Sequence, residues 1–106
     1  MRLALLLPLA LLATACANTQ VTKTGPTYPP TDPASIKVFL TKQTDCTNLE
    51  ELGAIMTPLK WNQEKAIEDA KVNAGRLGAT HIRIINMANN AFNDARVSVI
   101  AYRCTP

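Results

Sequence analysis

The sequence has few of the side chains that enzymes and metal sites use most often. His81 is the only histidine, and neither Cys-x-x-Cys nor His-x-x-x-His spacing occurs in the 106 residues. No glycine-rich loop follows a predicted strand, so a motif that cradles phosphates is missing too. We therefore expect a protein that is not an enzyme, with no catalytic residues, no cofactor and no metal site.

Long apolar segments and runs of one charge are also lacking. Eleven Lys and Arg residues face eight Asp and Glu residues without forming a basic stripe, so nucleic acid is not an expected partner. The longest apolar run, Leu3 to Leu12, is too short to be a permanent membrane span, which needs roughly 20 residues. No second run of that kind follows it.

The N-terminus has the features of an export signal. Arg2 precedes the apolar run, and Ala13-Thr14-Ala15 places small residues before Cys16. This stretch resembles the lipobox of bacterial lipoproteins, in which the cysteine receives diacylglycerol and becomes the first residue of the mature chain. Ala13 stands where leucine is usual, and ordinary secretion is the alternative. The prediction is a signal peptide over residues 1–15 that is removed, and lipidation of Cys16.

The cysteine count agrees with lipidation. Three cysteines leave one thiol to explain in an exported protein, and a lipid on Cys16 would account for it. Cys46 and Cys104 then remain as an even pair in an oxidising compartment. A bridge between them would contribute about 4 kcal/mol in the chain-entropy model. A redox-active or metal-ligating pair is the other interpretation.

Composition divides the rest of the chain into a tether and a domain. Residues 16–33 are rich in Thr and Pro and show neither helical nor strand periodicity, so they are predicted to be an extended tether with a reach on the order of 50 Å. Tyr28 within it is expected to be an unburied spacer residue, or else part of a peptide that docks on a partner. Residues 34–106 are predicted to form one small domain.

Apolar alternation predicts four strands in this domain. They are Ile36–Leu40, Leu49–Met56, Thr80–Met87 and Arg96–Cys104. Gly53 is expected at a bulge or a close approach of two backbones. In the last strand Val97, Val99 and Ala101 share one side, whereas Ser98, Ile100, Tyr102 and Cys104 share the other.

A helix is predicted from Gln63 to Leu77. Asn62 suits the N-cap, Glu64 lies in the first turn, and Gly78 stands where a positive φ ends the helix. Its apolar face is made of Ile67, Ala70, Ala74 and Leu77, and the small Ala66, Ala70 and Ala74 would allow close packing. Gly75 also hints at a tight contact. The predicted fold is a small two-layer α/β (α+β) sandwich of order β-β-α-β-β, with the helix packed on a mixed sheet.

The remaining polar and aromatic candidates have a structural and a functional interpretation. His81 is expected to be structural or exposed, and a ligand or proton switch is the alternative. Trp61 is expected to cover the core rather than to anchor a partner. The acidic groups are expected to be solvated rather than to act as acid and base; they are Glu50, Glu51, Glu64, Glu68 and Asp69.

Short motifs in the domain resemble a family of small Gram-negative lipoproteins of unknown function. The motifs are Cys46, Leu52-Gly53, Asn73-Ala74, Leu77-Gly78-Ala79-Thr80 and Tyr102-Arg103-Cys104. The layout is also similar to the periplasmic domain of the RcsF family, outer-membrane lipoproteins that sense envelope stress, although this chain has fewer domain cysteines. The resemblance implies that Cys46 pairs with Cys104, and it implies no catalytic residue.

These features together predict where the protein acts. Ala17 is not the aspartate that favours retention in the inner membrane, so we expect an outer-membrane anchor facing the periplasm. The expected partners are the membrane, through the lipid, and another envelope component that the domain binds or senses. A module that binds a small ligand or a metal, using His81 with the cysteines or acidic side chains, is the alternative.

Overall fold

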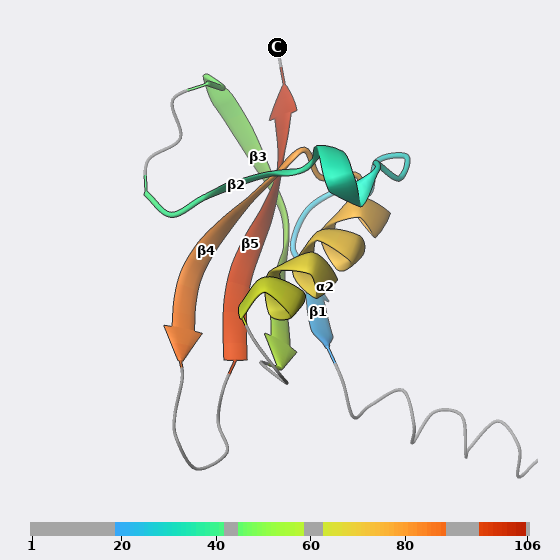
Figure 1. Ribbon diagram of the computed structural model, residues 1–106. Coiled ribbons are helices and arrows are strands. Elements are labelled where there is room, and N and C mark those ends of the chain that lie inside the picture. The colour runs from blue at the N-terminus through green and yellow to red at the C-terminus, as the bar shows by residue number, and fades with distance from the viewer. Residues whose placement is uncertain (1–18, 42–44, 59–62, 89–95, 106) are drawn as a thin grey trace, which may run out of the picture.

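A computed structural model describes residues 19–41, 45–58, 63–88 and 96–105. They form a five-stranded sheet with one helix, α2 (Gln63–Arg76), on one face (Figure 1). The strands are β1 (Gln20–Lys23), β2 (Lys37–Phe39), β3 (Asn48–Pro58), β4 (His81–Ala88) and β5 (Arg96–Thr105), and a short 3-10 turn, η1 (Pro33–Ser35), precedes β2. The predicted α+β class, with one helix packed on a mixed sheet, is confirmed.

The strands lie in the order β1-β3-β5-β4-β2. All neighbours are antiparallel except β4 and β2, which run parallel. The longest strands, β3 and β5, pair at the centre, and their register shifts between Glu51 and Gly53. The bulge expected at Gly53 is therefore confirmed. A second irregularity lies in β4 between Ile84 and Asn86.

The core lies between the sheet and α2. Val97, Val99 and Ala101 of β5 are fully buried on this side, as their alternation predicts. Ala66, Ala70 and Ala74 are the buried face of the helix, and their small side chains allow its backbone to lie close to the strands. The buried Thr57 hydroxyl donates to the Ala66 carbonyl at 3.1 Å, so this polar group in the core is satisfied.

The helix ends close to the predicted position. Glu64 lies in its first turn, Arg76 is its last residue, and Gly78 has a φ of +86° just beyond it. The expected positive φ is thus confirmed, whereas Leu77 lies one residue outside the helix. The proposed N-cap, Asn62, lies outside the described residues, as does Trp61.

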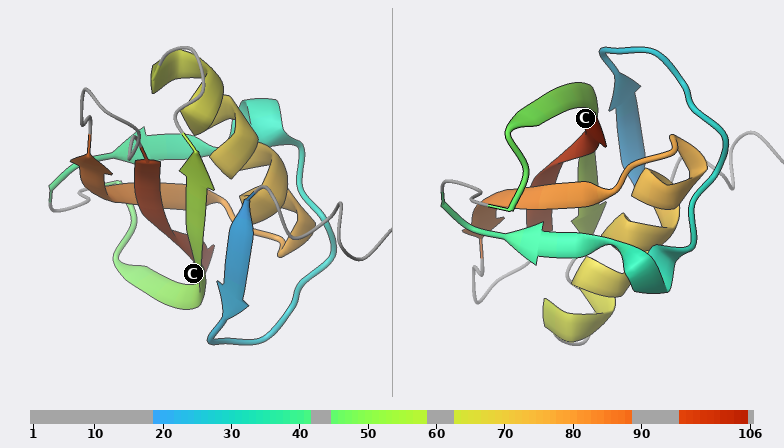
Figure 2. Two further views of the ribbon diagram at one scale, coloured as in Figure 1. Left: turned by 90° about the horizontal axis from the view of Figure 1, so that it is seen from below. Right: turned by 90° about the horizontal axis from the view of Figure 1, so that it is seen from above.

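Residues 19–33, the described part of the predicted tether, are not a free extended linker. Gln20–Lys23 form β1, which pairs with Gly53–Met56 of β3 and adds a fifth strand to the expected four. The chain then runs around the C-terminal end of α2 to η1 (Figure 2). Its Thr and Pro side chains gave no alternation, because β1 is a four-residue edge strand exposed at every position. Its pairing depends on backbone N–H and C=O groups, which every residue except proline carries in full.

Four backbone hydrogen bonds hold the segment from Thr24 to Thr31, which we call the strap, and the first two run from Thr24 and Gly25 to the Leu52 carbonyl. The amide of Tyr28 donates to the Leu77 carbonyl at 3.1 Å, and the amide of Thr31 donates to the Gly75 carbonyl at 2.9 Å. A Cβ at position 75 would lie 2.7 Å from the Thr31 carbonyl oxygen. The tight packing expected at Gly75 is therefore confirmed, and the strap is what packs there.

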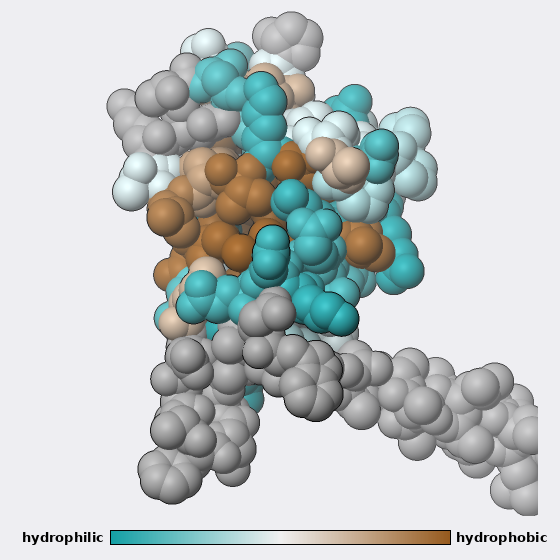
Figure 3. All heavy atoms as spheres, in the orientation of Figure 1, coloured by the Kyte–Doolittle hydropathy of each residue, from teal (hydrophilic) through white to brown (hydrophobic). Residues whose placement is uncertain are grey.

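On the face of the sheet that carries α2, the helix does not cover every strand. Apolar side chains gather beside α2, over β2 and β4 (Figure 3). In the predicted first strand only Ile36 is buried, whereas Val38 is 38% and Leu40 66% exposed. Alternation placed these three residues on one face, but β2 lies at the edge of the sheet, beyond the cover of the helix.

None of the helices among the described residues is long and apolar enough to cross a membrane.

Candidate functional site

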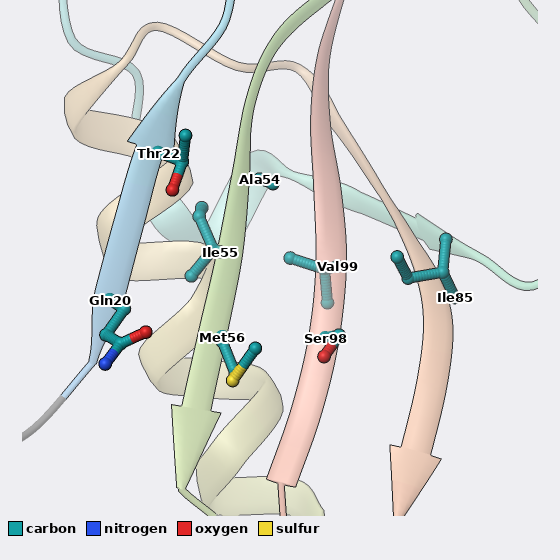
Figure 4. Close-up of a pocket in the computed structure, with 8 residues that line it drawn as sticks. All are labelled: Gln20, Thr22, Ala54, Ile55, Met56, Ile85, Ser98 and Val99. Atoms are coloured by element: carbon teal, nitrogen blue, oxygen red, sulfur yellow. The ribbon is translucent and has the colours of Figure 1, made fainter.

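The face of the sheet opposite α2 has no helix among the described residues, and we call it the open face. A shallow hollow of about 180 Å³ lies there, across four strands (Figure 4). Met56, Ile85 and Ala54 make it apolar, and Gln20, Thr22 and Ser98 give it a polar rim. Ile85 is 49% exposed. The volume is smaller than the roughly 300–1,000 Å³ of drug-sized ligand pockets, so the hollow suits a side chain of a protein partner better.

A second hollow, of about 230 Å³, lies at the other end of the strands, next to the disulfide. Its lining includes Phe39 of β2, Arg83 of β4 and Tyr102 of β5. Phe39 pairs with Arg83, whereas Tyr102 pairs with His81, two positions before Arg83 in β4. Ile82 and Ile84 are buried in the core, so Arg83 between them faces away from α2. The second hollow therefore lies on the open face as well.

Cys46 and Cys104 form a disulfide at the rim of the second hollow. Their Cα atoms are 6.0 Å apart, and 58 positions separate them in the chain. The pairing expected from the cysteine count and from the family resemblance is confirmed. The bridge ties the segment before β3 to the end of β5.

A chain of hydrogen bonds connects His81 to both cysteine segments. Its Nε2 lies 3.1 Å from Asp45 Oδ1, and its Nδ1 lies 2.8 Å from the Thr80 hydroxyl. That hydroxyl accepts a hydrogen bond from the Cys104 amide at 2.7 Å, which leaves its own proton for Nδ1. Neutral His81 then carries its proton on Nε2 and donates it to Asp45. With 4% exposure and both ring nitrogens bonded, His81 has the structural role expected of it.

Asp45 also accepts a hydrogen bond from the Lys37 ammonium at 2.7 Å. This bond, and after it the hydrogen bond to His81, hold the pKa of Asp45 below its usual value. Asp45 therefore stays ionised through the neutral range. Because both of its oxygens are engaged by β2 and β4, it joins the loop before Cys46 to the edge of the sheet.

Tyr28 packs on the domain instead of standing free in a tether. Its hydroxyl donates to Glu50, and the guanidinium carbon of Arg103 lies 4.5 Å from the centre of its ring. The hydrogen bond to Glu50 is the main cause that raises the pKa of Tyr28. The prediction of an unburied spacer is wrong, because two side chains far along the sequence provide a binding place for the ring.

The other candidates from the sequence do not gather into a catalytic or metal site. Glu51 is exposed and accepts from Thr24 at 2.6 Å, whereas Glu64, Glu68 and Asp69 lie exposed on the helix. Within the described ranges, no three His, Cys, Asp or Glu side chains come together as metal ligands would. Cys16 lies outside those ranges, so its lipidation stays a prediction.

Arg83 was missed because arginine at an exposed strand position is ordinary. The sequence did contain one signal: a cation between Ile82 and Ile84, on the side of the strand away from the core. Phe39 and Tyr102 could not be placed beside it, since strand order does not follow from composition. The parallel pairing of β2 with β4 places Phe39 beside Arg83, and the antiparallel pairing of β5 with β4 brings Tyr102 to the same part of the sheet.

Comparisons with known proteins find a similar fold but no family. No family model matches the chain, and no curated protein matches it. Among solved structures, the crystal structure of a Francisella virulence factor, FvfA, in the orthorhombic form is similar. The TM-score is 0.52 at 19% sequence identity, and the match covers 79% of this chain and 93% of that one. At this identity the likeness shows a shared fold alone.

Proposed function

We propose that this protein is an outer-membrane lipoprotein, anchored through Cys16 and facing the periplasm, that binds another envelope protein without catalysing a reaction. The lipobox-like stretch before Cys16 and the similarity to the RcsF family support the anchor. The disulfide between Cys46 and Cys104 is consistent with an oxidising compartment. The partner is expected to belong to the same envelope.

The observation that carries the proposal is the apolar hollow on the open face. Its polar rim includes Gln20 and Thr22 of β1, the first strand after the predicted lipidation site. An anchor at Cys16 would therefore hold this end of the face near the membrane, where another envelope protein can reach it. An apolar cavity with a polar rim, sized for a side chain, is how protein interfaces take up a dominant anchor residue.

Site-specific photocrosslinking in Gram-negative cells tests the docking surface. A photoreactive residue at Thr22, on the rim, should give one discrete adduct with an envelope protein, and the same residue at Asp69, on the exposed side of α2, should not. Ser98→Arg should abolish the Thr22 adduct by filling the hollow. Equal adducts from both positions, or an adduct that survives Ser98→Arg, would contradict the docking surface.

Mass spectrometry of the protein extracted from membranes tests the anchor. The mature chain should begin at Cys16, carry acyl chains on it and lack the two hydrogen atoms that the disulfide removes. Cys16→Ser should release the protein from the membrane without changing its fold. An unmodified chain that begins at Cys16 or later would contradict the anchor and leave the docking surface to its own test.

A further inference from the structure

We infer that the second hollow is an anion site in which Arg83 binds a carboxylate or phosphate group of a small ligand. The site is separate from the docking surface and does not depend on it. Its lining combines one cation with two aromatic rings and two hydroxyl side chains: Arg83, Phe39, Tyr102, Thr41 and Thr47. Cys46, at the rim, is held in place by the disulfide.

The Arg83 guanidinium carries its charge without a counter-ion from the described residues. Its Nε is buried and has no hydrogen-bond partner there. Burying that donor without a partner costs free energy, whereas the side chain as a whole is partly exposed and a guanidinium has four further N–H donors on its terminal nitrogens. An acceptor from outside the chain could reach the terminal N–H groups and offset this cost, because a hydrogen bond between ions is stronger than one between neutral groups.

The nearby acidic side chains are engaged by other partners. Asp45 accepts from Lys37 and His81, Glu50 from Tyr28, and Glu51 from Thr24. Lys37 is in turn occupied by Asp45 at 2.7 Å. Arg83 is therefore the cation that remains available on this part of the described open face, and an anion can bind without displacing an internal ion pair.

The shape of the hollow selects the class of ligand. The Phe39 and Tyr102 ring centres are 6.1 Å apart, and the planes are inclined at 39°. Both rings line the hollow together with Arg83 and give it apolar surface, and such surroundings lower the local dielectric and strengthen an ionic hydrogen bond. The volume of about 230 Å³ admits a short carboxylate or a phosphate group but is below the usual range for drug-sized molecules. Planar guanidinium can hold either oxyanion through two parallel hydrogen bonds.

Titration of the full-length, disulfide-bonded protein with acetate and with inorganic phosphate, each against chloride at equal ionic strength, tests the site. Calorimetry gives the affinity, and nitrogen-15 NMR of the arginine side chains reports which guanidinium responds. Saturable binding of acetate, of phosphate or of both, with a shift of the Arg83 signals, supports the proposal and identifies the preferred oxyanion. No saturable binding of either, or binding without a response at Arg83, overturns it.

Three variants separate the site from general charge effects. R83Q should abolish the binding, and R83K, which keeps the charge but loses the planar fork, should weaken it by about tenfold or more. R76Q removes an exposed arginine at the end of α2 and should bind as the wild type does. The NMR fingerprint confirms that each variant is folded. If R83Q is folded and binds the anion as tightly as R76Q, the proposal is wrong.

Discussion

The two faces of the sheet differ in the burial and the polarity of their side chains. Where α2 covers the sheet, the side chains between them are buried and almost all apolar, such as Val97, Val99 and Ala70. On the open face the same strands present half-buried and polar side chains such as Ser98, Arg83 and Tyr102. The covered face is what folding requires, so the residues on the open face are the better place to look for function.

Removal of the disulfide is expected to have the largest effect on stability, because the bridge constrains the whole chain. It nevertheless lies beside the open face. The double variant C46S/C104S should lower the free energy of unfolding by about 4 kcal/mol, since the bridge spans 58 positions. That is a large part of the roughly 5–15 kcal/mol available to a typical domain. Urea unfolding measures it, and reduction of the wild type should reproduce it. A loss below about 1 kcal/mol would show that the bridge contributes little to stability.

A matched pair of substitutions compares the faces directly. Ala70→Leu should destabilise the fold by about 1–3 kcal/mol, because Ala70 is fully buried between helix and sheet and the added atoms have no space. Ser98→Leu, on the open face, should change stability by less than about 0.5 kcal/mol. Thermal and urea unfolding of both variants measure the difference. Equal destabilisation would mean that the open face is packed as tightly as the covered one.

A smaller effect is expected from the ionised Asp45. Because its pKa is lowered in the folded state, its stabilising contribution is present above the ordinary carboxyl pKa of about 3.9 and is lost as the pH falls through the lower folded value. Urea midpoints should therefore fall less between about pH 7 and pH 3 in D45N than in the wild type. Added salt should reduce the difference, since Lys37 and Asp45 lie near the surface. Parallel pH profiles would contradict this role.

Much of the covered face could be predicted from the sequence. Alternation in β5 and the spacing of Ala66, Ala70 and Ala74 each report a buried face directly, because burial selects apolar side chains at a fixed period. The prediction at Gly78 is confirmed for a related reason: a positive φ strongly favours glycine. These signals depend only on residues that are close in the sequence, so they can be recognised without knowing which strands pair.

The open face and β1 were not predictable in the same way. β1 is held by backbone hydrogen bonds to β3. These bonds do not determine which side chains an exposed edge strand carries, so its sequence shows no pattern. The Tyr28 contact with Glu50 and Arg103 joins residues that are distant in sequence, and its ring gave no hint of a partner. The two rings that line the hollow with Arg83 come from its neighbouring strands, Phe39 from the parallel β2 and Tyr102 from the antiparallel β5, and the sequence did not reveal either pairing.

The early pairing of β1 sets how an anchored domain would stand on a membrane. Only residues 17–19 separate Cys16 from Gln20, and at roughly 3.3 Å each they extend on the order of 10 Å, far less than the reach expected of an eighteen-residue tether. A domain lipidated at Cys16 would rest almost against the headgroups. A force that pulls the lipid away from the domain would act on β1 first. The four-residue pairing of β1 with β3 would then be the first part of the fold to separate.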